Sequence, residues 1–478
     1  MAARARLANA LRMRLSLTLL ALALLPACSS GDESPTPAGA AGVGGTASSG
    51  AGETGSTSTG TGGEGSGGAP QGTTTGAGGS APEPTGSIRY PADARHSPLA
   101  KSVIERLTGI LAASPGRHDI FAKVGDSNTV NTGFLRCLAS ADLKLAAHAA
   151  LEPTRAFFAA TLADGIRTSF DRTTLAAKVG WTAGAVVTGD PTPLEQEVAV
   201  LHPAFAVVML GTNDTTAQGI DPFSRNLLRV VDEAVGLGVI PLLTTIPERA
   251  DTAEAKALVP EMNAVVRAVA QARQVPLMDL EGALRDLPGY GLISDGIHLD
   301  SYVSGGVHAC WFDEAGLSEG MNRRNLLTLE ALDRARRFLL EGEAPEPRPA
   351  DLVGTGTWEQ PFGIDALPFV DDRDTSLSVT SSAKMYSCAS ADESGPEVVY
   401  RLKLSEPTDL RIRVFDDANT DIDIQFMADP GGAAHCLARA DKVLDVTAGP
   451  GTYWISADTY AGSGKSATGA YLLTVVRR

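Results

Sequence analysis

The sequence predicts an α/β domain with a parallel sheet, followed by an all-β sandwich. Short apolar runs alternate with amphipathic helical patterns in the first part of the chain, which favours a parallel sheet covered by helices on both faces. Beyond about residue 352 the pattern changes to short strands separated by turn residues, as in a sandwich. Between the two parts, the prolines of Ala344–Pro349 prevent both helix and sheet interior.

The chain begins with the pattern of a secretion signal. Four arginines precede an apolar run, Leu15–Leu25, that is followed by Pro26-Ala27-Cys28 and is short for a membrane span. This ending resembles a bacterial lipobox, which implies that residues 1–27 are removed and that Cys28 is lipidated. An ordinary signal cut before Ser29 is the alternative.

A tether is predicted for residues 28–87. Gly, Ser, Thr, Ala and Pro dominate this stretch, and it has too few large apolar side chains to bury a core. A flexible coil of about 55 such residues has a root-mean-square reach of about 40 Å. We therefore expect an exported protein of the bacterial cell envelope, lipid-anchored to the outer membrane or cell surface, that contacts the membrane only through its anchor.

The charge and the cysteines restrict the partners and the compartment. The formal charge of −16 becomes −20 once the four arginines of the signal are removed (−16 − 4), so nucleic acid is an improbable partner. Four cysteines besides Cys28 lie in an exported setting and allow three pairings. The simplest arrangement pairs Cys137 with Cys310 and Cys388 with Cys436, within each domain.

The first domain is predicted to span residues 88–343, before a linker at 344–352. A helix is expected to open at Ser97-Pro98, which supply a cap and a first-turn proline. Further helices are expected at 135–150, 223–235, 253–272 and 326–340. Buried strands are expected at 120–124, 176–179, 205–210, 239–243 and 275–278.

Three polar clusters lie where such a domain places its site. Gly125-Asp126-Ser127 ends the first strand, Gly211–Asp214 ends the strand at 205–210, and Ser294–His298 comes late in the domain. Ligand sites of parallel sheets form at the carboxyl ends of the strands. A serine on the sharp corner after a strand is held clear of the sheet, and its own N–H is free to help bind an oxyanion.

With these clusters the sequence resembles the SGNH hydrolases, also called GDSL hydrolases, from about Arg117 to His298. The resemblance implies a three-layer α/β/α fold with a flavodoxin-like sheet and an ester substrate, either a small molecule or a polysaccharide. It also implies that Ser127, Asp295 and His298 are catalytic, together with Asn213 and one glycine. Gly184 is favoured over Gly180 for that glycine, because it should fall in the loop after the strand.

These residue types suit ester hydrolysis on chemical grounds as well. Ser127 would attack the carbonyl, and His298 would take its proton and pass it to the leaving alcohol. Asp295 would fix the imidazole tautomer. The oxyanion would lie among the N–H groups of Ser127 and Gly184 and the side-chain amide of Asn213. This mechanism needs no cofactor and no metal.

Two other constellations compete with this assignment. Gly316–Gly320 fits the G-x-S-x-G pattern literally, but no apolar strand precedes it, and only His435 lies downstream to complete its triad. Four side chains suggest a metallohydrolase, although their spacing matches no compact zinc signature. These are His298, Asp300, His308 and Asp313.

The second domain, residues 353–478, resembles the bacterial pre-peptidase C-terminal domain, a jelly-roll-like module of secreted hydrolases. Five strands are expected, at 398–404, 410–414, 422–426, 453–457 and 471–475. Asp417–Asp423 imitates the start of a calcium loop, but the sixth position is not glycine and Ala428 stands where glutamate is needed. We therefore expect this segment to be a solvent-exposed connection between strands. For the domain as a whole, the role considered is binding of substrate polymer or of the cell surface.

The sequence thus predicts an exported, lipid-anchored serine esterase that hydrolyses carboxylic esters, with short acyl or O-acetyl groups favoured. The alternative is a surface lipoprotein that binds through its second domain and has kept the hydrolase scaffold without turnover. The joint presence of Ser127, Asn213, Asp295 and His298 favours the enzyme.

Overall fold

A computed structural model describes residues 87–478 except 114–115, 430 and 463–465. The predicted signal peptide, Cys28 and the predicted tether up to Gly86 lie outside the described residues. The described residues belong to one compact unit, Pro82–Arg478. None of the helices within them combines the length and apolarity that crossing a bilayer requires.

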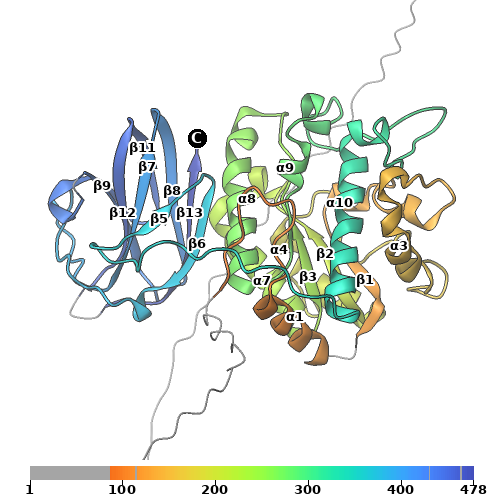
Figure 1. Cartoon of the computed structure of the whole chain (residues 1–478), viewed down its shortest axis with the longest axis horizontal. Helices are drawn as coiled ribbons and strands as arrows, with labels where there is room; N and C mark the ends of the chain where they lie inside the picture. The colour runs from red at the N-terminus through yellow and green to blue at the C-terminus, as the bar shows by residue number, and fades with distance from the viewer. Residues whose placement is uncertain (1–86, 114–115, 430, 463–465) are drawn as a thin grey trace, which may run out of the picture. The chain divides into compact units, whose positions relative to one another are not determined.

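A parallel sheet of four strands forms the centre of the first part (Figure 1). Its order is β1-β2-β3-β4, and all three neighbouring pairs run parallel. Each strand overlaps a run predicted as a strand. Their bounds are β1 (Arg117–Gly125), β2 (Pro203–Met209), β3 (Ile240–Thr244) and β4 (Leu277–Met278).

The prediction of a strand at 176–179 was wrong, because only a single parallel bridge joins Ala177 to Gly125. Ala176 and Ala177 are buried, whereas Lys178 and Val179 are exposed, so too few side chains pack here to extend a ladder. The bridge lies beyond β1, on the side away from β2. Counted as a rudimentary strand, it gives the sheet the flavodoxin-like order 2-1-3-4-5 that the family resemblance implied.

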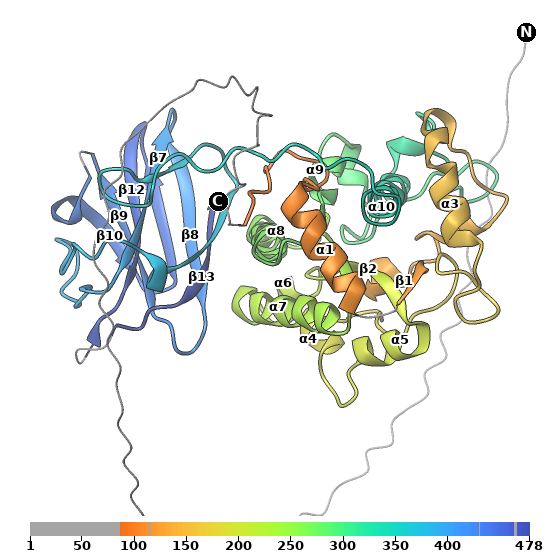
Figure 2. The same cartoon turned by 60° about the horizontal axis from the view of Figure 1, so that its bottom comes forward.

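Helices cover both faces of the sheet, which explains why every residue of β2 is buried. Figure 2 shows the helices on the two sides of β1 and β2. One face carries α1 (Lys101–Ala113), α3 (Glu152–Ala159) and α10 (Gly320–Ala335). The other carries α4 (Ala183–Val186), α5 (Pro193–Leu201) and α7 (Ile220–Gly236), with α8 (Ala253–Arg273) beside α7.

Two helix predictions were wrong in position or extent. α1 begins at Lys101 and not at Pro98, because the Ser97 hydroxyl accepts from the Leu277 amide (2.9 Å) and the Leu99 amide donates to Glu346 (2.7 Å). Instead of a helix at 135–150 there are two short 3-10 turns, η1 (Arg136–Ala139) and η2 (Ala146–Leu151). The residues at their starts, Leu135 and Ala146, have positive φ of 63° and 49°, which a right-handed helix cannot continue through.

The closing helix is longer than predicted. α10 begins six residues before the expected start and continues into a π-helical turn, η5 (Arg336–Leu340). Five shorter elements complete this part of the unit: α2 (Ser127–Val130), α6 (Asp214–Ala217), α9 (Leu280–Leu284), η3 (Pro288–Gly291) and η4 (Gly316–Ser318).

Two packed sheets form the sandwich, with orders β10-β9-β12-β7-β5 and β11-β8-β13-β6. Side chains such as Ile412, Ile424 and Ile455 fill the core between them. All five predicted strands are present, and they are β7 (Glu397–Leu404), β8 (Thr408–Asp416), β9 (Ile422–Ala428), β12 (Gly451–Thr459) and β13 (Ala470–Arg477). The remaining elements are β5 (Phe362–Ile364), β6 (Phe369–Asp374), η6 (Thr375–Leu377), η7 (Ala433–His435), β10 (Cys436–Ala440) and β11 (Val443–Ala448).

The cysteines pair within each part, as expected: Cys137 with Cys310 and Cys388 with Cys436.

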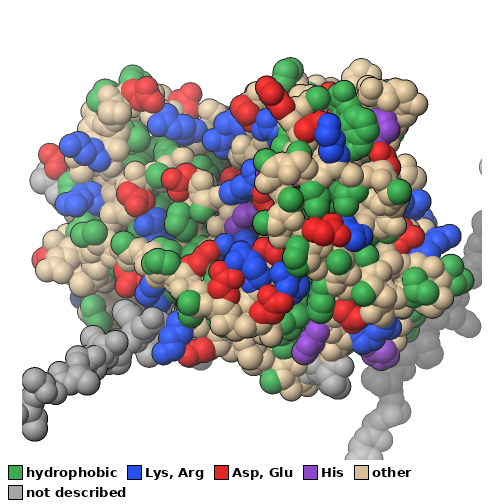
Figure 3. Space-filling view, turned by 45° about the vertical axis from the view of Figure 1, so that its right-hand side comes forward, with side chains coloured by type: hydrophobic (Ala, Val, Ile, Leu, Met, Phe, Trp, Pro, Cys, Tyr) green, Lys and Arg blue, Asp and Glu red, His purple; other side chains and the backbone are tan. Residues whose placement is uncertain are grey.

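In the same compact unit, β6 and β13 pack against α8, and the buried Glu261 of α8 accepts from Arg413 of β8 (3.1 Å). Figure 3 shows acidic and basic side chains intermixed over one face of the molecule.

Candidate active site

The predicted catalytic residues lie at the carboxyl edge of the parallel sheet. Ser127 follows β1, and Asn213 follows β2. Asp295 and His298 lie on the loop between η3 and η4. Because the strands are parallel, the segments that leave β1 and β2 emerge at the same edge, and the later loop folds back onto it.

The chain turns sharply between β1 and the one-turn helix α2. Gly125 is required there, because a Cβ at this position would lie 2.2 Å from the Thr129 hydroxyl and 2.7 Å from the Met209 carbonyl. The buried Asp126 then caps α2, and its carboxylate accepts from the Asn128 amide (2.9 Å). Ser127 is thereby held as the first residue of α2, with its side chain partly exposed.

The structure brings Ser127, His298 and Asp295 into one hydrogen-bonded chain. His298 Nε2 lies 2.8 Å from Ser127 Oγ, and His298 Nδ1 lies 2.7 Å from Asp295 Oδ2. With Asp295 accepting from Nδ1–H, Nε2 is left as the acceptor that faces the serine hydroxyl. Ser127 and His298 are 171 residues apart in sequence, whereas Asp295 and His298 are only 3 residues apart.

The loop that carries Asp295 and His298 is a tight turn. Asp295 Oδ1 accepts from the amides of Ile297 (2.9 Å) and His298 (3.0 Å). The loop after β3 supports it from outside, because the Ala250 amide donates to the Gly296 carbonyl (2.8 Å). Burial raises the pKa of Asp295, but the hydrogen bonds from His298 and Ile297 outweigh it and hold the pKa below its ordinary value. Asp295 therefore stays ionised and able to orient the imidazole.

The residues predicted for the oxyanion hole belong to two linked segments. The Asn213 side-chain amide donates to the Trp181 carbonyl (2.9 Å), and the Asp214 carboxylate accepts from the Ala183 amide (3.1 Å). Burial raises the pKa of Asp214 to about 7, although the hydrogen bond from the Ala183 amide lowers it in part. The segment after β2 thus holds the loop that leads into Gly184.

The structure distinguishes the two candidate glycines by their surroundings. Gly184 is buried in the first turn of α4, where an added Cβ would lie 2.8 Å from the side-chain nitrogen of Asn226. Gly180 is exposed, with φ of +79° and open space around it. Gly184 therefore lies in the more constrained position, next to the Ala183 amide that Asp214 binds.

The competing constellations do not assemble a second site. Ser318 lies in the 3-10 turn η4, where its hydroxyl donates to the Ala315 carbonyl (2.7 Å), and no strand precedes it. The four metallohydrolase candidates are separately engaged: His308 contacts Asp142 (2.8 Å), Asp313 pairs with Lys144, and Asp300 accepts from the Gly320 amide (2.6 Å).

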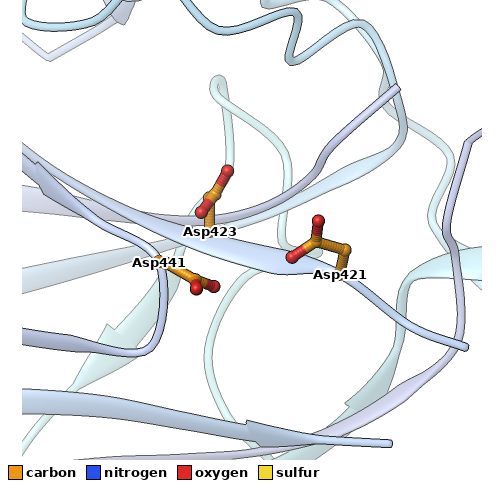
Figure 4. A group of neighbouring side chains, drawn as sticks. All are labelled: Asp421, Asp423 and Asp441. Carbon is orange, nitrogen blue, oxygen red and sulfur yellow. The ribbon is translucent and has the colours of Figure 1, made fainter. Parts of the chain in front are cut away.

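Within the described ranges, the one group spaced to hold a metal ion is Asp421, Asp423 and Asp441 of the sandwich (Figure 4). The ammonium of Lys442 lies 3.2 Å from an Asp421 oxygen and 3.0 Å from an Asp441 oxygen. Burial lowers the pKa of Lys442, but its bonds to Asp416 and Asp441 outweigh this and raise it. Lys442 thus pairs with two of these carboxylates, and Arg439 pairs with the third, Asp423.

Sequence reasoning missed the polar residues of the closing helix. Asn322, Arg324 and Asn325 lie before residue 326, where the closing helix was predicted to start, yet all three belong to α10 and are almost completely buried. The local sequence gives no sign that the loops beside the site cover these polar side chains. Asp126, from the Gly125-Asp126-Ser127 cluster, holds the turn after β1 as the N-cap of α2.

Comparison with protein families matches residues 124–302 to the GDSL-like Lipase/Acylhydrolase family. Comparison with curated proteins finds no match. Similar solved structures include a GDSL-like lipase from Bacteroides thetaiotaomicron, with 17% identity and a TM-score of 0.28, over 48% of this chain and 98% of that one. An acetylxylan esterase from Geobacillus stearothermophilus has 16% identity and a TM-score of 0.30, over 45% of this chain and 95% of that one.

A peptidoglycan O-acetylesterase is also similar, with 14% identity and a TM-score of 0.27, over 34% of this chain and 46% of that one. These identities and TM-scores are too low to transfer a substrate to this chain.

Proposed function

We propose that this chain, whose residues 124–302 match the GDSL-like Lipase/Acylhydrolase family, is an exported serine esterase that removes short acyl or O-acetyl groups. The observation that carries the mechanism is the hydrogen-bonded chain from Ser127 Oγ through His298 to Asp295, with distances of 2.8 and 2.7 Å.

In the proposed mechanism Ser127 Oγ attacks the carbonyl carbon of the ester. Its proton passes to His298 Nε2, and the ionised Asp295 stabilises the imidazolium that forms. The tetrahedral intermediate then expels the alcohol, which takes the proton back from His298. Water, deprotonated by the same imidazole, attacks the acyl-serine, and the imidazolium returns the proton to Ser127 Oγ as the carboxylic acid is released.

The charge that develops on the carbonyl oxygen needs donors that are already in place. We assign this role to the N–H groups of Ser127 and Gly184 and to the side-chain amide of Asn213. One N–H of the Asn213 amide is used on the Trp181 carbonyl, which fixes the orientation of the group, and an amide has a second N–H to offer.

The location of the enzyme forms part of the proposal. Cleavage before Cys28 and lipidation of that cysteine would hold the enzyme at the cell envelope, with the glycine- and serine-rich segment as a tether. Such a tether gives access to esters on surface polymers, and we assign polymer or surface binding to the sandwich. Cys28→Ser tests the anchor: the variant should leave the membrane fraction, and retention there would contradict lipidation.

The activity test compares two serines in the same protein. Ser127→Ala should abolish hydrolysis of a short-chain acetyl ester, whereas Ser318→Ala, which removes the serine of the competing G-x-S-x-G pattern, should retain the wild-type rate. Equal rates for wild type and Ser127→Ala would favour the alternative, a surface-binding lipoprotein without turnover.

A further inference from the structure

The first half of α10 presents buried polar side chains to the loops around the proposed site. Asn322, Arg324 and Asn325 are at most 1% exposed, and Arg324 is among the largest fully buried side chains of the described residues. Buried polar groups are costly unless they are hydrogen-bonded, so their partners show what they hold in place.

Arg324 closes the end of the helix that begins with Ser127. Its guanidinium donates to the Asn128 carbonyl (2.7 Å) and to the Thr129 hydroxyl (3.1 Å), and it lies 3.7 Å from the centre of the Phe134 ring. The carbonyls of a helix's last turn have no partner within the helix, and an arginine beside them supplies the missing donors.

A helix of one turn depends on such contacts, because a single turn gains too few backbone hydrogen bonds to offset the order it requires. α2 has four residues. Asp126 caps its start, and Arg324 caps its end. Burial raises the pKa of Asp126, and the charge of Arg324 is the largest influence that lowers it, so the two caps also compensate each other's charge.

The neighbours of Arg324 join the serine side of the site to the histidine side. Asn325 accepts from the Leu135 amide (2.9 Å) and donates to the Ala309 carbonyl (3.0 Å). Asn322 accepts from the Tyr302 amide (3.2 Å). The polar face of α10 therefore contacts both the segment after Ser127 and the segment after His298.

We propose that Arg324 is a positioning residue for Ser127: by capping the C-terminal end of α2 from the closing helix, it keeps the serine hydroxyl within hydrogen-bonding reach of His298. Arg324 touches neither substrate nor the reacting atoms. The inference rests on the proposed esterase function. It adds a residue from outside the matched segment 124–302 to the machinery of the site.

The first test removes the guanidinium and compares two buried arginines in the full chain. Arg324→Met should lower kcat for an acetyl ester at least about tenfold, because small displacements of a reacting group are costly in rate, with KM within about twofold. Arg324→Lys should recover part of the loss. Arg267→Met is the control for stability, since Arg267 is equally buried but pairs with Asp279 under α9 (2.6 Å).

The second test removes only the Thr129 hydroxyl, so it still decides the question if Arg324→Met fails to fold. Thr129→Val removes one acceptor of Arg324 at nearly constant volume, and Thr129→Ser keeps it. We expect a kcat for Thr129→Val at least about threefold below that of Thr129→Ser, with similar melting temperatures, because only the contact of Arg324 is lost.

The outcomes separate this inference from the function on which it rests. A wild type as inactive as Ser127→Ala would overturn the esterase proposal itself. An active wild type whose kcat is matched by folded Arg324→Met, or by Thr129→Val, would overturn the positioning role alone. Equal kcat losses in Arg324→Met and Arg267→Met would assign the effect to global stability and also overturn it.

Discussion

The carboxylates of the Ser127 site and those of the sandwich differ in what surrounds them. Asp295 is well exposed, accepts three hydrogen bonds and has a lowered pKa. In the sandwich, Glu397, Asp458 and Asp423 lie directly opposite one another on the neighbouring strands β7, β12 and β9, and all three are buried. Burial raises the pKa of Asp458 to about 9.

The comparison teaches that a strongly shifted pKa is a poor guide to the site in this molecule. Arg439 pairs with both Asp423 and Glu393, and burial raises the pKa of Glu393 to about 8. Asp458 accepts from the Tyr386 hydroxyl, which also contacts the Ser456 hydroxyl (3.1 Å), but both of these side chains are buried and out of reach of solvent. At the sheet edge Asp295, His298 and Ser127 are instead aligned in one hydrogen-bonded chain that solvent can reach. Geometry therefore supports the proposed site, whereas the raised pKa values describe the cost of burial.

The largest expected effect concerns Asp295. Asp295→Asn should lower kcat by about a thousandfold to ten-thousandfold, because the amide no longer fixes the imidazole tautomer or stabilises the imidazolium. Steady-state hydrolysis of an acetyl ester measures this, with Asp300→Asn as an acidic control on the same loop. A loss below tenfold would show that the aligned carboxylate is not what distinguishes the two regions.

Asn213→Ala tests the oxyanion donors next. Removal of one such donor costs about a hundredfold to a thousandfold in kcat, so a loss of that order is expected with little change in KM. Asn226→Ala serves as the matched control, because this side-chain amide lies beside Gly184 and donates to Gln218 (3.2 Å). An undiminished kcat for Asn213→Ala would remove this residue from the mechanism.

The sandwich should respond to pH through its stability. The pKa values of Asp458 and Glu393 are raised in the folded state above ordinary values near 4, so the folded state binds more protons between pH of about 4 and 9. Stability is then greatest at the acidic end of this window and falls as pH rises. Calorimetry should show the sandwich melting at least about 5 °C lower at pH 9 than at pH 5.

Asp458→Asn checks the origin of that slope, because an amide of the same shape does not titrate. The variant should melt at a temperature that depends less on pH than the wild type does. An unchanged slope would mean that other groups set the pH dependence and that the buried acids of the sandwich are compensated in another way.

The smallest effect is expected at Asp214, which supports the glycine loop without touching substrate. Asp214→Asn keeps an acceptor for the Ala183 amide and should stay within about threefold of the wild-type kcat, whereas Asp214→Ala leaves that buried amide unpaired and should lose about tenfold. Equal rates in the two variants would show that the contact does not position Gly184.

Local signals in the sequence were sufficient for the strands and for the polar blocks at the carboxyl edge. The apolar runs at β1, β2 and β3 are nearly continuous, and Gly125 marks a turn that only glycine fits. The helix predicted at 135–150 failed because positive φ at Leu135 and Ala146 is imposed by tertiary contacts, such as the bond from the Leu135 amide to Asn325.

Other features have no local signal at all. In β6 and β10 apolar and polar side chains do not alternate regularly, so the two-residue period of a strand cannot be recognised in the sequence. The burial of Arg324 depends on a contact across 196 residues, and a helical pattern cannot distinguish such a side chain from a solvated one. Sequence therefore predicts residues that define a motif more readily than residues that support it.

The central claim is that Ser127 is the nucleophile and that His298 activates it. Labelling with a fluorophosphonate, followed by peptide mapping, measures this directly. We expect a single modified serine, Ser127, and at least a hundredfold slower labelling in His298→Ala, on the order expected when a general base is lost. Ester hydrolysis by a protein whose label maps to another serine, or whose labelling rate is unchanged in His298→Ala, would contradict it.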